Sequence, residues 1–140
     1  MQTRASILIK RRPDDIFSFI ADPANDHLWR SHLIASRGHV TGVGDRVSQT
    51  YSAQAVSKTI DLEVSEFQPP ERLAYRMREP VRARLAFQCR PEGGGTRVSM
   101  SLSAEVSGIA SVMEGRAEAE VTKLARTDLE RLRRVLESMG

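Results

Sequence analysis

The stretch RRPDDIFSFIADPANDHLW, residues 11–29, interrupts the chain directly after a segment with the pattern of a β-strand. Pro13 suits the first turn of a helix, where its missing N–H leaves no hydrogen bond unmade, and two acidic residues follow where the helix dipole favours negative charge. Asp22 and Pro23 repeat this start signal. The stretch therefore predicts two short helices, the second ending near Trp29, the only tryptophan.

Apolar and polar residues alternate on both sides of this stretch, which is typical of strands with one buried and one solvated face. Residues 3–10 form the first such segment. Turn sequences separate six more, which run over residues 33–40, 47–55, 60–64, 73–77, 81–89 and 98–106. Alternation of this kind predicts an antiparallel sheet with one apolar face.

Beyond Gly108 the apolar residues recur at helical spacing. The stripe comprises Ala117, Val121, Leu124, Leu132, Val135, Leu136 and Met139. A helix of ~30 residues spans ~45 Å and can cover the apolar face of the sheet. Gly115 predicts a bend, or a helix that is regular only beyond Arg116. We expect an α+β fold in a single domain over residues 1–140.

Composition excludes several classes of protein. The 140 residues carry a net charge of +3 and one cysteine, Cys89, so an internal disulfide and a cysteine-rich metal site are excluded. No apolar run reaches the ~18 residues of a membrane span, and Met1–Lys10 is too polar for a signal peptide. We expect a cytoplasmic protein without metal or cofactor, with Cys89 as a small buried side chain.

Five segments, taken in order, resemble the START-like superfamily (SRPBCC, helix-grip fold), and within it the polyketide cyclase/dehydrase and lipid-transport-like family. They are SILIKRRPDDIFSFIADPANDHLW at 6–29, VGD at 43–45, VSEFQPPERLAYR at 64–76, GGGTRVSM at 93–100 and DLERLRRVLE at 128–137. The resemblance implies a curved seven-stranded antiparallel sheet wrapped around a long C-terminal helix, with two short helices between strands 1 and 2. It also implies a cavity for lipids, quinones or polyketides. Some family members are cyclases or dehydratases, many only bind, and some act on protein or ribosome partners.

Alternation and helix position select the side chains that would line such a cavity. They are Phe17, Trp29, Gln49, Tyr51, Leu62, Tyr75, Met77, Leu85, Phe87, Met100, Ile109, Met113 and Ala117. For each residue the alternative is ordinary core packing between sheet and helix. Trp29 suits either a cavity mouth or a core plug, and Ile109 and Met113 suit either a movable gate or packing at the helix start.

Titratable residues offer few catalytic candidates. His27 and His32 suit acid or base roles at the cavity mouth, with plain solvent exposure as the alternative, and the spacing of the three histidines does not favour a metal site. Asp128 falls within the apolar stripe of the last helix. It is either an acid that anchors a ligand or a residue at the stripe edge paired with Arg131. We assign no catalytic residue.

The outer face of two adjacent predicted strands carries five arginines, Arg72, Arg76, Arg78, Arg82 and Arg84. They form either a phosphate- or RNA-binding surface or a solvated face that resists edge-to-edge association. The absence of interleaved exposed aromatic residues disfavours RNA. If Val64 pairs with Leu73, Asp61 lies opposite Arg76.

Three functions remain open. The first is a carrier or sensor of a small hydrophobic molecule such as a lipid, quinone or polyketide, held between sheet and helix. The second is a cyclase or dehydratase that uses cavity Tyr and His groups. The third is a ribosome- or membrane-associated adaptor that uses the basic sheet face. Because the inward-facing strand residues include almost no acid or base, we favour binding without catalysis, by a monomer or homodimer that does not bind DNA.

Overall fold

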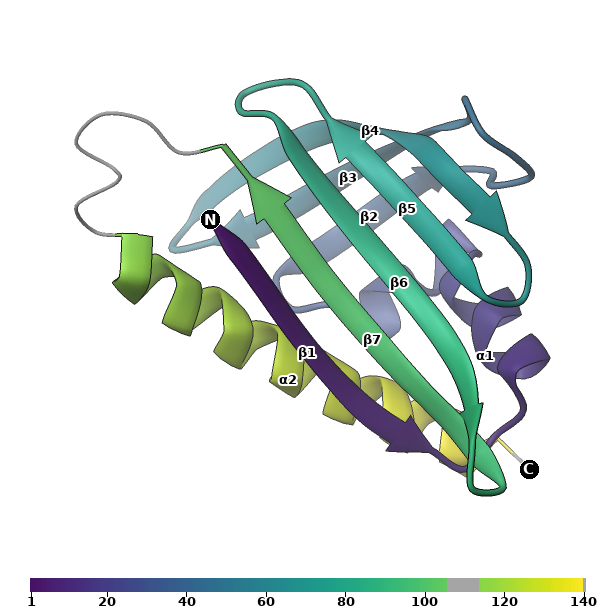
Figure 1. Cartoon of the computed structure of the whole chain (residues 1–140). Coiled ribbons are helices and arrows are strands. Elements are labelled where there is room, and N and C mark those ends of the chain that lie inside the picture. Colours follow the sequence, from purple (N-terminus) through teal and green to yellow (C-terminus); the bar gives the residue numbers. More distant parts are fainter. Residues whose placement is uncertain (106–113, 140) are drawn as a thin grey trace.

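The computed structural model describes residues 1–105 and 114–139, and in this part of the chain the strands form one seven-stranded antiparallel sheet (Figure 1). The strands are β1 (Gln2–Ile9), β2 (Leu33–Gly38), β3 (Arg46–Ala53), β4 (Val56–Gln68), β5 (Arg72–Met77), β6 (Ala83–Glu92) and β7 (Gly95–Ala104). Their order across the sheet is β1-β7-β6-β5-β4-β3-β2. The curved sheet wraps around the C-terminal helix α2 (Glu114–Ser138), so the predicted helix-grip fold is confirmed.

The two short helices between β1 and β2 form where the sequence predicts them. Helix α1 (Pro13–Ile20) begins at its proline and buries Ile16, Phe17, Phe19 and Ile20. The second, η1 (Pro23–Leu28), is a 3₁₀ helix. The Asp22 side chain caps it by accepting a hydrogen bond from the backbone N–H of Ala24 at 3.0 Å.

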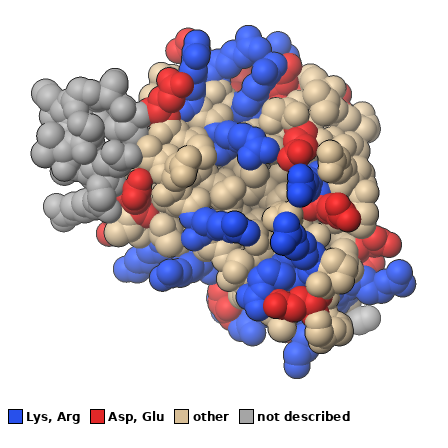
Figure 2. Space-filling view, in the orientation of Figure 1, with Lys and Arg blue, Asp and Glu red and all other residues tan. Residues whose placement is uncertain are grey.

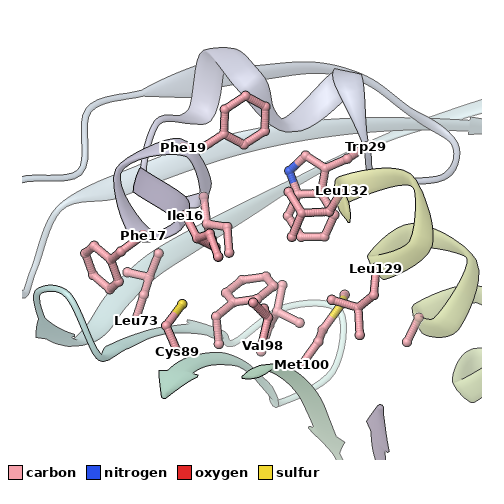
Figure 3. Close-up of a cluster of buried hydrophobic side chains, with 14 of the residues drawn as sticks. Ile16, Phe17, Phe19, Trp29, Leu73, Cys89, Val98, Met100, Leu129 and Leu132 are labelled. Carbon is pink, nitrogen blue, oxygen red and sulfur yellow. The ribbon is translucent and has the colours of Figure 1, made fainter. Parts of the chain in front are cut away.

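One end of the space between sheet and helices is filled by a solid apolar core (Figure 3). Trp29, 1% exposed, packs edge-on against Phe87 of β6 with ring centroids 5.8 Å apart. Leu129 and Leu132 of α2 reach the same cluster, and Cys89 is buried within it. The core therefore joins α1, η1, α2 and the sheet at a single place.

Helix α2 is attached to the N-terminal part of the chain at both ends. The backbone N–H of Gln2 donates to Glu118 Oε1 at 3.2 Å near the start of α2. At the other end Arg11 Nη1 donates to the carbonyl oxygens of Leu136 and Met139, at 2.7 and 2.6 Å. The Leu136 carbonyl also accepts from the backbone N–H of Met139 at 3.2 Å, and the Arg11 guanidinium adds a charged donor at this C-terminus. Among the described helices, none is long and apolar enough to cross a membrane.

The buried face of α2 differs from the predicted stripe. Ala125 and Leu129 are buried although the stripe omitted them, whereas Ala117, Leu124 and Met139 are exposed. A helix presents more than one continuous arc of apolar residues, and the contact with the sheet selects which arc is buried. The predicted alternative of a helix that is regular only beyond Arg116 is wrong, because α2 is helical from Glu114 and includes Gly115. Residues 106–113, which precede α2, lie outside the described part of the chain.

The predicted register of β4 and β5 is wrong by two residues. Val64 pairs with Tyr75 rather than Leu73, and the register shifts between Val64 and Glu66. Glu63, not Asp61, therefore lies opposite Arg76 and accepts a hydrogen bond from its Nε at 2.7 Å. The offset begins at the β4–β5 turn, where Gln68 pairs with Arg72, and the bulge between Val64 and Glu66 changes the pairing by one position. Alternation does not reveal either the turn length or the bulge.

Replacing Leu132 by alanine tests whether α2 is held by its buried face. We expect Leu132→Ala to lower the free energy of unfolding by about 2–5 kcal/mol, because it leaves a cavity in the core. The matched variant Leu124→Ala changes a residue that is 41% exposed on the same helix and should cost under about 1 kcal/mol. Urea unfolding of both variants measures the difference, and equal losses would contradict this packing.

Candidate functional site

Beyond the solid core, the space between the inner face of the sheet and α2 stays open as a cavity of about 520 Å³. Its wall is mainly apolar and comes from β1, β3–β7 and α2, together with the connection between η1 and β2. Val121, Leu124 and Ala125 supply the α2 side. The cavity has the size and the apolar lining typical of sites for small organic molecules.

The structure brings together seven of the thirteen side chains selected from the sequence as cavity lining. Those in the wall are Gln49, Tyr51, Leu62, Tyr75, Met77, Leu85 and Met100. Phe17, Trp29 and Phe87 lie in the solid core instead, and Ala117 is exposed on α2 outside the wall. Ile109 and Met113 lie outside the described residues.

Arg30 lies in the cavity wall and was not selected from the sequence. Its side chain is 11% exposed, and its guanidinium lies over the Trp29 ring, 5.5 Å from the centroid. Arg30 Nη2 donates to the Tyr51 hydroxyl at 3.4 Å. Arg30 follows the end of η1, where periodicity no longer indicates direction, so its inward position required the tertiary structure.

Asp128 of α2 is the counter-ion of Arg30. It is 4% exposed, and its Oδ2 lies 3.4 Å from Arg30 Nε. Its Oδ1 accepts hydrogen bonds from the backbone N–H of Ser31, at 3.0 Å, and from the Ser31 hydroxyl. The predicted pairing with Arg131 is wrong: Arg131 Nη1 instead donates to the Trp29 carbonyl oxygen at 3.5 Å. A buried carboxylate thus joins α2 to the segment after η1.

A second buried carboxylate, Asp26 of η1, lies behind the cavity wall. It is 4% exposed, and its Oδ2 accepts hydrogen bonds from Ser36 Oγ at 3.0 Å and Gln49 Nε2 at 3.2 Å. Burial raises the pKa of Asp26 to about 6, although the hydrogen bond from Ser36 and the charge of Arg30 oppose the increase. Gln49 Oε1 in turn accepts the Tyr51 hydroxyl proton at 2.7 Å.

These contacts gather the polar groups into one region of the wall, the polar end, consisting of Arg30, Ser31, Gln49, Tyr51 and Asp128. Tyr75 stands on the inner face with 3% exposure, and among the described residues none is hydrogen-bonded to its hydroxyl. Burial raises the pKa of Tyr75 and, to a smaller extent, that of Tyr51, so both phenols keep their protons at neutral pH.

A family model described as polyketide cyclase / dehydrase and lipid transport matches residues 1–137. The chain belongs to this family. The resemblance inferred from the sequence is therefore confirmed, and membership in the cyclase/dehydrase and lipid-transport family supports a ligand-binding or cyclase role. Among curated proteins, none matches the sequence.

Several solved structures share the fold of this family member. TTHA0849 from Thermus thermophilus has a TM-score of 0.82 at 18% identity, with 100% of each chain covered. SA2116 from Staphylococcus aureus also scores 0.82, at 9% identity, over 99% of this chain and 94% of that one. The di-domain ARO/CYC BexL from the BE-7585A biosynthetic pathway scores 0.79 at 16% identity, over 98% of this chain and 46% of that one.

The histidines and Cys89, which were also singled out from the sequence, lie at the edge of the cavity or away from it. His27, His32 and His39 are exposed, and of the three only His32 borders the cavity. Burial raises the pKa of the Cys89 thiol to about 12, so Cys89 is an inert core residue. Within residues 1–105 and 114–139, no group of three or more His, Cys, Asp or Glu side chains could hold a metal ion.

Of the five arginines predicted on one face, Arg72, Arg76 and Arg84 lie on the outer face of the sheet, whereas Arg78 and Arg82 lie in the connection between β5 and β6. Figure 2 shows that Lys and Arg side chains on the outer face are interspersed with Asp and Glu. Arg76 and Arg78 both contact Glu63, at 2.5 and 3.8 Å. Arg84 contacts Glu66 at 3.2 Å. Ion pairs therefore neutralise part of the positive charge on this face.

Removing the Asp128 carboxylate tests the buried ion pair. We expect Asp128→Ala to destabilise the fold by about 3–5 kcal/mol, because Arg30 stays buried without its partner. The matched control Asp15→Ala removes a carboxylate that is 48% exposed and paired with Arg11, and should cost about 1 kcal/mol or less. Denaturant unfolding at neutral pH compares the two, and a similar cost for both would show that Asp128 is not buried as described.

The pKa of Asp26 predicts a pH dependence of stability. The folded state holds the Asp26 proton up to about pH 6, whereas the unfolded chain releases it near the ordinary aspartate value of 3.8. The raised pKa of Asp26 therefore adds about 3 kcal/mol to the free energy of unfolding at pH values below 3.8. This contribution is lost as the pH rises from 3.8 to about 6. Asp26→Asn should remove this decline and leave unchanged the contributions of carboxylates with lowered pKa values, such as Asp45 and Glu63, whose contributions to stability increase with pH. Unfolding measured from pH 4 to 7 tests the difference, and parallel curves for the two proteins would contradict it.

Proposed function

We propose that this protein binds a small hydrophobic molecule in the cavity between the sheet and α2 and acts in the cytoplasm as a carrier or sensor, without converting its ligand. The observation that supports this most directly is the cavity of about 520 Å³, apolar over most of its wall and polar at one end. An amphiphile with an apolar body and one polar terminus, of the lipid, quinone or polyketide kind, complements such a wall.

Apolar burial supplies the affinity in this proposal. Burying about 300 Å² of apolar ligand surface contributes roughly 7 kcal/mol at about 25 cal/mol per Å². Part of this gain is lost when the ligand loses its freedom of motion. Apolar burial alone therefore leaves less than about 7 kcal/mol, which corresponds to a dissociation constant weaker than about 10 micromolar. An affinity of this order suits a carrier, which has to release its ligand as well as bind it.

The polar end then orients the ligand. Arg30 makes two contacts of 3.4 Å, to Tyr51 and to Asp128, and both are long for charge-assisted hydrogen bonds. Its guanidinium therefore keeps donor capacity for a ligand oxygen. The Tyr75 hydroxyl offers a second polar contact on the inner face. Ligand specificity in this proposal depends on these few groups.

The state of the ionisable groups favours binding over catalysis. A cyclase or dehydratase needs a base within reach of the substrate. In the cavity wall, Asp128 is engaged by Arg30 and Ser31, and burial keeps the two tyrosines protonated. His32 is exposed at the edge of the wall. The alternative role, a cyclase that uses cavity Tyr and His groups, would have to rely on His32.

Native mass spectrometry of the protein purified from its own host tests the proposal. We expect a co-purifying organic molecule of a size that the cavity can hold, and incubation with the enriched molecule should return it unchanged. A modified product would favour the cyclase alternative instead. Preparations that carry no adduct and bind no hydrophobic probe would contradict the proposal.

Filling the cavity should weaken binding without disturbing the fold. Ala83 lies in the cavity wall, whereas Ala86 of the same strand faces the outer side of the sheet. We expect Ala83→Trp to weaken binding of the neutral probe N-phenyl-1-naphthylamine by about ten-fold or more, because the indole occupies ligand space. Ala86→Trp, the matched control, should bind like the parent protein. Fluorescence titration measures both, and equal affinities would place the ligand elsewhere.

A further inference from the structure

A continuous chain of hydrogen bonds connects the buried carboxylate of Asp26 to the cavity. Gln49 Nε2 donates to Asp26 Oδ2 at 3.2 Å, and Tyr51 donates its hydroxyl proton to Gln49 Oε1 at 2.7 Å. Arg30 Nη2 then donates to the Tyr51 oxygen at 3.4 Å. Gln49, Tyr51 and Arg30 lie in the cavity wall, whereas Asp26 is not among the lining residues.

The chemistry of the carboxylate sets the direction of this chain. An ionised carboxylate only accepts hydrogen bonds, so the Gln49 amide has to present its NH₂ group to Asp26. The amide oxygen of Gln49 then faces Tyr51 and takes the only proton of the phenol. The Tyr51 oxygen is left with accepting capacity alone, and Arg30 next to it only donates.

We propose that Asp26, without touching the ligand, sets the hydrogen-bond polarity of the polar end, that is, which of its groups donate and which accept. The ligand therefore presents a hydroxyl group there and belongs to the phenols or alcohols rather than the ethers. A hydroxyl donates to the Tyr51 oxygen and accepts from Arg30 at once. An ether oxygen accepts from Arg30 but leaves the Tyr51 oxygen facing another lone pair, which costs free energy. This inference rests on the proposed binding function and makes Asp26 a positioning residue.

Protonation of Asp26 gives the opposite polarity. A neutral Asp26 carries a donor of its own, so the Gln49 amide can turn and accept from it, which frees the Tyr51 proton to face the cavity. Several groups face Asp26. Arg30 and the hydrogen bonds from Ser36 and Gln49 favour its ionised form, Asp22 disfavours it, and Tyr75 lies close enough to be affected by its charge. Because burial is the largest influence and the pKa is about 6, the polarity reverses near pH 6.

Two matched probes test the inference. 2-Naphthol and 2-methoxynaphthalene share an aromatic body and stay uncharged between about pH 5 and 8, and they differ in one hydroxyl donor. At about pH 8 we expect the parent protein to bind 2-naphthol about five-fold more tightly, the effect of one hydrogen bond. The ratio of the two dissociation constants should fall as the pH drops through about 6. Fluorescence and calorimetric titrations measure both probes.

Three variants separate positioning from general structural effects. Asp26→Asn keeps the shape but removes the charge, and we expect its probe ratio to be near unity and independent of pH. Tyr51→Phe should lose the preference as well. Asp22→Asn is the matched control, because it removes a nearby exposed carboxylate outside the hydrogen-bond chain. It should keep the ratio at pH 8 and still show a fall at lower pH, with a midpoint below that of the parent protein because Asp22 disfavours the ionised form of Asp26. His32 is retained in every variant, so an effect of its ring would persist in Asp26→Asn.

Each outcome decides between the two proposals. Equal affinity of the parent protein for both probes at pH 8 overturns the role of Asp26 but leaves the binding function intact. The same holds if Asp26→Asn weakens both probes equally and keeps the ratio, since Asp26 would then act only on the fold. If Asp26→Asn does not fold, the pH dependence of the ratio in the parent protein and in Tyr51→Phe decides the question. Failure of the parent protein to bind either probe overturns the binding function and this inference together.

Discussion

The inner face of the sheet is mainly apolar, and two short helices and one long helix cover it. The aromatic residues of α1, together with Trp29 directly after η1, pack against the sheet and α2 at one end and build a solid core there. Toward the other end, among the residues that the structure describes, α2 is the helix that faces the sheet, with side chains as small as Ala125 and Val121. A curved sheet stands too far from a single helix for such side chains to meet it, so this end stays hollow.

Arg30 and Asp128 form part of the cavity wall at the hollow end. Asp128 is buried and the Arg30 side chain is only 11% exposed, so each ion would be costly there without the other. Asp128 also accepts a hydrogen bond from Ser31, and Arg30 donates one to the Tyr51 oxygen. The pair also joins α2 to the segment between η1 and β2, so the same contact that stabilises the helix position creates the polar end. Structural and functional roles therefore fall on the same residues.

Asp26 lies behind the cavity wall and is connected to the polar end through Gln49. Its carboxylate is held by β2 and β3 side chains, and Gln49 transmits its protonation state to Tyr51. Such networks are sensitive to one proton, because each amide or hydroxyl in the chain has a fixed number of donors and acceptors. A wall that is mostly apolar makes these few polar groups decisive for which ligands fit.

Local pattern alone determined much of this protein. Alternation gave the strands, the two Asp/Pro start signals gave the short helices, and the ordered motifs identified the family, because these features depend on neighbours within a few residues. Inward-facing positions such as Tyr51, Tyr75 and Met100 followed from the same alternation. Only the tertiary structure decided the rest. The β4 bulge shifts the pairing with β5, the packing of α2 buries Leu129 and exposes Leu124, and Asp128 meets Arg30, which lies far away along the chain in a segment without periodicity. Contacts of this kind depend on how separate elements come together in space, which residue periodicity does not encode.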